Sequence, residues 1–106
     1  MTPTYPWTGR SGTAYHYEIY LVDRPMADVP GNYILCRLVD GRWQPLYVGE
    51  AESLAAQCSD DHEQWRSAIG MGATHLHAKV TRGGEQMRCD EANDLREAYN
   101  SPLNDQ

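Results

Sequence analysis

The stretch GNYILCRLVDGRWQPLYVG, residues 31–49, decides the fold of this chain. Its first part, residues 32–39, is almost continuously apolar, which favours a strand in the middle of a sheet. The dipeptide Asp-Gly at 40–41 is a strong signal for a tight hairpin turn. Residues 43–48 then predict the antiparallel partner strand. Pro45 within it cannot donate a backbone hydrogen bond, which indicates an edge strand or a bulge.

The segments on either side of this hairpin complete a mixed pattern. Aromatic and β-branched residues predict a strand before it, and helix-prone and alternating segments follow it. In chain order these are a strand (15–22), two helices (51–58 and 62–71), a strand (74–81) and a last helix (85–99). We therefore expect an α+β (mixed α/β) fold, a small and mostly antiparallel sheet flanked by about three helices.

The length of 106 residues fits one compact domain. Within it we expect an N-terminal arm and extra strand over residues 1–30 and the main body over residues 31–106. Residues 1–14 are rich in Pro, Gly, Thr and Ser, which predicts an extended arm. Tyr5 and Trp7 favour docking of this arm on its own domain, and a partner-binding arm is the alternative.

Charge and cysteine usage restrict the partners. The net charge of -6 argues against general binding to nucleic-acid phosphates. Three widely spaced cysteines without a CxxC pair argue against a disulfide framework or a zinc knuckle. The N-terminus has no apolar signal region, and no apolar run approaches the roughly 20 residues of a membrane span. We expect a cytoplasmic protein with no membrane partner.

Short motifs carry the functional signal. GNY at 31–33 opens the predicted middle strand, and YVG at 47–49 closes its partner. GATHLH at 72–77 opens the later strand, and PLN at 102–104 follows the last helix. In order and spacing these motifs resemble the GIY-YIG nuclease domain over residues 31–104. The resemblance implies cleavage of DNA phosphodiester bonds with Mg²⁺ or Mn²⁺.

The resemblance also implies roles for individual residues. Tyr33 and Tyr47 stand at the two motif tyrosines, whose phenols share a pocket and help to position or deprotonate the attacking water. Gly31 and Gly49 stand at the motif glycines, and Gly49 is expected to let the chain turn tightly from strand to helix beside the pocket. Asn104 matches the family's terminal asparagine.

Two positions depart from the family pattern. Gln57 stands about eight residues after Gly49, where the family has an arginine, and a glutamine cannot offset developing negative charge. Ala92 stands where the family has its glutamate metal ligand, and Glu91 lies one residue earlier. One residue is about 100° around a helix, so Glu91 would point off the pocket unless the register shifts. Both substitutions indicate an impaired site.

Other residues could supply the missing groups. Glu91 could hold a metal ion if the last helix is offset. Arg66 or Arg88 could replace the missing cation, although the simpler interpretation of both is a solvated surface ion pair. His62 could act on a proton in the pocket, because histidine titrates near neutral pH.

Two histidines on the predicted strand 74–81 suggest another metal. His75 and His77 are two residues apart and share a face, and with His62 they could bind zinc. The ligand count is short, so the simpler interpretation is polar residues on a sheet face.

Three functions remain open. The substitutions and the acidic charge favour a GIY-YIG-like domain with a degenerate site, which needs no cofactor and binds a protein or a nucleic acid. A protein partner fits the charge better than DNA. A small-ligand pocket that reuses the nuclease cleft is a further alternative. The catalytic alternative is a divergent Mg²⁺- or Mn²⁺-dependent DNA endonuclease that uses Tyr33, Tyr47, His62 and Glu91.

Overall fold

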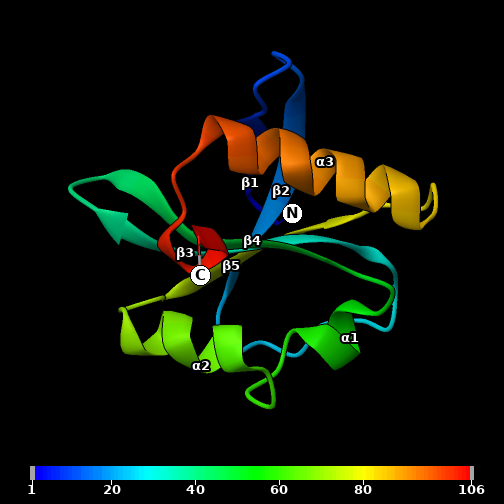
Figure 1. Ribbon diagram of the computed structural model, residues 1–106. Helices are drawn as coiled ribbons and strands as arrows, with labels where there is room; N and C mark the ends of the chain where they lie inside the picture. The colour runs from blue at the N-terminus through cyan, green and yellow to red at the C-terminus, as the bar shows by residue number, and fades with distance from the viewer. Residues whose placement is uncertain (1, 106) are drawn as a thin grey trace.

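The computed structural model describes residues 2–105 as five strands, three α-helices and a terminal 3₁₀ turn (Figure 1). The strands are β1 (Thr4–Thr8), β2 (Ala14–Leu21), β3 (Gly31–Val39), β4 (Arg42–Ala51) and β5 (His75–Val80). The helices are α1 (Leu54–Gln57), α2 (Glu63–Gly70) and α3 (Glu85–Ala98), and the 3₁₀ turn η1 spans Pro102–Asp105. The predicted α+β class is confirmed. Within the described residues no helix is long and apolar enough to cross a bilayer.

All five strands pair antiparallel in the order β1-β2-β5-β3-β4, so β3 lies inside the sheet and β4 at an edge. The expectation for Pro45, an edge strand or a bulge, is confirmed on both counts. Leu35 pairs with Tyr47 but Cys36 pairs with Pro45, which leaves Leu46 as the extra residue of a bulge. The bulge occurs where proline cannot donate to the ladder.

Two segments differ from the prediction. Residues 4–8, expected to be an extended arm, form the edge strand β1 beside β2. Trp7 on this strand is 1% exposed, so the expected docking of these residues on their own domain is confirmed. The helix expected over 51–58 is shorter, because β4 continues to Ala51 and the Ser53 side chain caps α1 only afterwards.

The sheet carries a core on each face, as Figure 1 shows with α3 on one side and α1 and α2 on the other. The α1–α2 face buries a cluster that includes Tyr33, Leu35, Leu54, Trp65 and Leu76. The α3 face buries a cluster that includes Trp7, Tyr17, Ile34, Val48 and Leu95. Because side chains alternate along a strand, the neighbours Tyr33 and Ile34 point into opposite cores.

Candidate functional site

Tyr33 and Tyr47 lie together on the α1–α2 face, with ring centroids 6.0 Å apart. Tyr33 is 3% exposed, and Tyr47 is half-buried. Gly49 pairs with Tyr33 across the strands, and a Cβ atom at Gly49 would stand 2.6 Å from Cζ of Tyr33. Gly49 lies inside β4, so it serves the close approach of this ring and not the tight strand-to-helix turn that we expected.

The surroundings of Tyr33 keep its phenol protonated. Burial raises the pKa of Tyr33 well above its usual range, and Tyr47 adds to the rise. Gln57 and Arg96 lie close enough to lower the pKa of Tyr33, but they only offset part of this rise. A general base works best with a pKa near the operating pH. Tyr33 can therefore donate a hydrogen bond, but it is a poor acceptor of a proton from water.

Asn104 binds the free edge of β4 beside this pair. The Val48 amide donates to Oδ1 of Asn104 over 2.7 Å, and Nδ2 of Asn104 donates to the Val48 carbonyl over 3.0 Å. Nε and Nη2 of Arg96 donate to the same carbonyl over 3.2 and 2.9 Å. The motif asparagine thus substitutes for a neighbouring strand at one residue.

Sequence reasoning missed Arg96. It proposed Arg66 or Arg88 as the cation near the tyrosines, whereas the arginine that influences Tyr33 is Arg96. A signal for it was present: Arg96 follows Ala92 by four residues, which places both on one side of α3.

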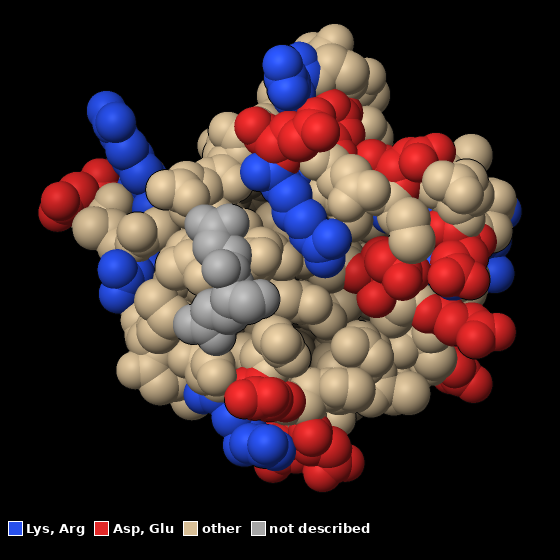
Figure 2. Space-filling model, in the orientation of Figure 1, with Lys and Arg blue, Asp and Glu red and all other residues tan. Residues whose placement is uncertain are grey.

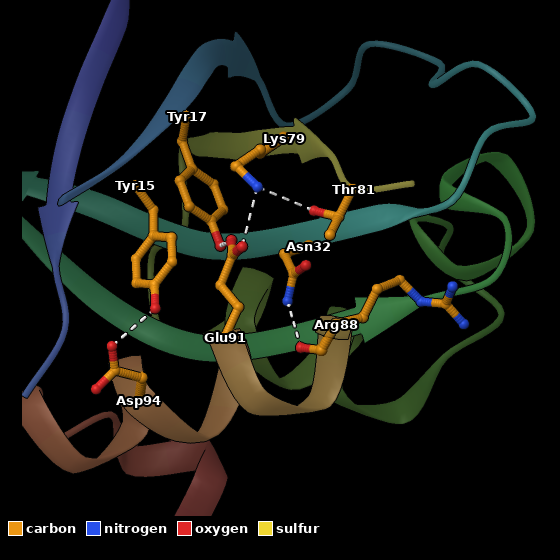
Figure 3. Close-up of polar contacts among 8 residues, drawn as sticks. All are labelled: Tyr15, Tyr17, Asn32, Lys79, Thr81, Arg88, Glu91 and Asp94. Carbon is orange, nitrogen blue, oxygen red and sulfur yellow. Dashed lines mark hydrogen bonds and ion pairs between the residues drawn. The ribbon is translucent and has the colours of Figure 1, made fainter. Parts of the chain in front are cut away.

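Glu91 lies on the other face of the sheet and is 5% exposed (Figure 3). Its Oε1 accepts from Nζ of Lys79 over 2.9 Å, and its Oε2 accepts from the Tyr17 hydroxyl over 2.5 Å. Lys79 also donates to Oγ1 of Thr81 over 3.2 Å. Both carboxylate oxygens therefore bind groups of the chain itself, and one partner is a cation.

The structure thus does not bring Glu91 together with Tyr33 and Tyr47. Tyr33 packs in the α1–α2 core, whereas Glu91 bonds to Tyr17 in the α3 core. Ala92 is 1% exposed in the same α3 core, so it also packs away from the tyrosines. The Glu91 carboxylate therefore lies apart from the two tyrosines and is paired with Lys79.

The remaining predicted residues have local roles. Arg88 pairs with Glu50 over 2.9 Å on the α3 face. Arg88 is only 7% exposed, so this is a largely buried ion pair and not the solvated surface pair of the simpler interpretation. Arg66 is exposed, and its Nη1 donates to the Asp60 carbonyl over 2.8 Å. His62 is the half-buried N-cap residue of α2 and makes no side-chain capping bond.

Two further polar contacts hold α3 against the sheet (Figure 3). Nδ2 of Asn32 donates to the Arg88 carbonyl over 2.9 Å. Asp94 accepts from the Tyr15 hydroxyl over 2.8 Å and from the backbone and side chain of Ser11. The Ser11 and Tyr15 hydrogen bonds lower the pKa of the Asp94 carboxyl. These contacts attach the β1–β2 hairpin to the helix.

Of the two histidines of β5, His77 is buried in the core and His75 is half-buried. His77 is 0% exposed, and its Nδ1 accepts from Nε1 of Trp7 over 2.9 Å. Burial, assisted by His75, lowers the pKa of His77 to about 4. His77 is therefore neutral at physiological pH. Over residues 2–105 no group of three or more His, Cys, Asp or Glu side chains is placed to hold a metal ion.

No protein-family model matches this sequence, and no curated protein and no solved structure matches it at a significant level. The resemblance to the GIY-YIG domain therefore depends on its short motifs and on their order.

Proposed function

We propose that this protein is a GIY-YIG-like domain with a degenerate nuclease site, which acts by binding a protein partner and does not cut DNA. The observation that carries the proposal is the position of Glu91. Its carboxylate lies on the α3 face, bound by Lys79 and Tyr17, while Tyr33 faces the α1–α2 core. A metal-assisted hydrolysis needs these groups around one ion.

The surroundings of the tyrosines support the same proposal. Gln57 influences Tyr33 from the place where the resemblance expects an arginine, and a neutral amide stabilises developing phosphate charge poorly. Arg96 is near, but two of its nitrogens donate to the Val48 carbonyl. In the proposed degenerate site the arginine and the carboxylate of the family are missing, while buried Tyr33 still lies beside half-buried Tyr47.

The distribution of charge favours a protein partner over DNA. The net charge is -6, and Figure 2 shows acidic side chains along one side of the molecule with basic side chains scattered among them. Lys79 and Arg88 are paired with acids. Binding to the DNA backbone would need several free cations on one face. A cytoplasmic location accompanies this proposal and is supported by three free thiols.

An apolar surface is available for such a partner. The name open apolar strip is used for Leu21, Leu38 and Trp43, which strand pairing and side-chain alternation place on the α3 face of the sheet. Leu21 is 60% exposed and Leu38 50%, and the Trp43 ring is half-buried beside Leu38. Apolar side chains that share an exposed sheet face favour contact with a protein.

A plasmid-nicking assay tests the loss of catalysis. We expect no nicking above the buffer rate with Mg²⁺ or Mn²⁺, for the native chain and for Gln57→Arg. Metal-dependent nicking by the native chain that Tyr47→Phe abolishes would overturn the proposal.

The binding half of the proposal needs a second assay. A protein captured by the native chain is purified and titrated against the native chain and against a Leu21→Gln/Leu38→Gln variant. The control is Ile69→Gln, which changes an apolar residue of α2 that is 44% exposed. We expect the strip variant alone to weaken binding by about tenfold or more. Equal binding by all three proteins, or tight binding to duplex DNA at about 150 mM salt, would contradict it.

A further inference from the structure

A hollow lies on the α1–α2 face, between strands β2 and β5 and the loop over residues 22–30. Its volume is about 270 Å³. The loop that forms one wall runs from β2 to β3 beside α1 (Figure 1). Most of the lining is apolar and comes from Tyr20, Met26, Val29, Leu54, Ala78 and Val80.

The wall of this hollow is held in place without a ligand. The amide of Leu54 donates to the Val29 carbonyl over 2.8 Å, and the amide of Ala55 donates to the Ala27 carbonyl over 3.1 Å. The Ser53 hydroxyl donates to Oδ1 of the Asp28 side chain over 2.6 Å. Three hydrogen bonds therefore tie the loop to the start of α1, so ligand binding carries no entropic cost for ordering the loop.

Two opposite charges stand at the edge of the hollow. The Arg24 guanidinium lies over the Tyr20 ring, 4.9 Å from its centroid. Glu18 lines the hollow two residues before Tyr20, on the same face of β2. Burial raises the pKa of Tyr20, and the nearby Glu18 carboxylate raises it further. Both charges thus flank one aromatic ring.

Neither charge is neutralised by the protein. Among residues 2–105, Glu18 and Arg24 form no ion pair with each other or with another side chain. Lys79 also lines the hollow, but its Nζ is held by Glu91 on the α3 face and cannot pair with Glu18. An unpaired cation and an unpaired anion beside an apolar cavity form a complementary set for a zwitterion.

We propose that this hollow binds a free α-amino acid with an apolar side chain. The ligand's carboxylate binds the Arg24 guanidinium, which the Tyr20 ring supports from below. Its ammonium group binds the Glu18 carboxylate. Its side chain enters the apolar part of the hollow against Leu54 and Ala78, and the volume suits a side chain of the size of leucine or phenylalanine. The site is separate from the tyrosine pair and does not depend on the proposed function.

Titration followed by amide NMR signals and by calorimetry tests this site. The probes are L-leucine and L-phenylalanine, with 4-methylpentanoate, which lacks the ammonium group, and 3-methylbutylamine, which lacks the carboxylate. We expect a dissociation constant of about 1 mM or below for an amino acid, which corresponds to a binding free energy of about 4 kcal/mol or more. A ligand of this size can supply that much from two charged contacts and one buried side chain. Each single-charge analogue should bind about tenfold more weakly or worse. The shifted amides should include Val29, Leu54 and Ala78.

Charge variants localise the binding. Arg24→Gln and Glu18→Gln should each weaken amino-acid binding about tenfold, and Arg82→Gln, another exposed arginine, should leave it unchanged. Ala78→Leu should fill the hollow and block binding. Because this larger side chain also strains the core, Arg24→Gln and Glu18→Gln are the variants that test the binding site. No shift with either amino acid at about 20 mM, equal binding of the single-charge analogues, or equal effects of Arg24→Gln and Arg82→Gln would overturn the proposal.

Discussion

Glu91→Gln should destabilise the protein because it removes the charge that neutralises Lys79. The two groups are 2.9 Å apart, and the Glu91 side chain is 5% exposed. Removing one partner of a fully buried pair costs about 3–5 kcal/mol. The Lys79 side chain is 28% exposed, so water can recover part of that cost. We therefore expect a loss of about 2–3 kcal/mol in the free energy of unfolding.

Urea unfolding and thermal scans measure this loss. For a chain of this length about 1 kcal/mol corresponds to about 4–5 °C, so the melting temperature should fall by about 8–15 °C. Glu97→Gln is the matched control on the same helix. Its ion pair with Arg10 spans 3.8 Å, and its side chains are 59% and 73% exposed, so its removal should have no measurable effect.

Two results would refute this reasoning. Equal melting temperatures for Glu91→Gln and Glu97→Gln would show that the buried pair contributes no more than the exposed one. Stabilisation of the native chain by Mg²⁺ that Glu91→Gln abolishes would show that the carboxylate binds a metal ion. That second result would also overturn the non-catalytic function proposed above.

Three further changes test the packing and the pH response. Lowering the pH from about 6.5 to 5 should reduce the urea midpoint. In the unfolded chain His77 takes up a proton near its usual pKa, whereas burial holds the pKa of folded His77 at about 4. His77→Phe should therefore make the urea midpoint depend less on pH over this range. Gly49→Ala should cost about 1–3 kcal/mol, since its Cβ would overlap the Tyr33 ring, and an unchanged urea midpoint would contradict this. Ala92→Glu should unfold the protein by circular dichroism, while Ala98→Glu at an exposed position of the same helix should not.

Local rules predicted the part of the fold that depends on neighbouring residues. Both residues of the 40–41 turn have positive φ, 52° at Asp40 and 77° at Gly41, as a tight hairpin turn requires. Pro45 marked the bulge correctly because its missing donor is a property of the residue itself. The start of α1 was predicted too early, because pairing with Gly31 extends β4 to Ala51 against a helix-prone composition.

The candidate site divides in the same way. The motifs correctly predicted that Tyr33 and Tyr47 lie together, because both belong to one hairpin with a short turn. The motifs predicted a turn at Gly49, whereas this glycine makes room for the Tyr33 ring on the neighbouring strand. The spacing of the motifs along the chain does not show a contact between strands. The spacing of Arg96 from Ala92 shows a shared side of α3, but the contact of Arg96 with the Val48 carbonyl of β4 depends on how α3 packs.

The sequence by itself determined the hairpin, the class of the fold and the opposite orientation of Tyr33 and Ile34, because side chains must alternate along an extended strand. Only the tertiary structure decided which face α3 covers. That choice depends on long-range packing of Ala92 and Leu95 against Ile34 and Val48, and on β5 entering the sheet between β2 and β3. Because α3 lies on the Ile34 side, the sheet separates the Glu91 carboxylate from Tyr33 and Tyr47.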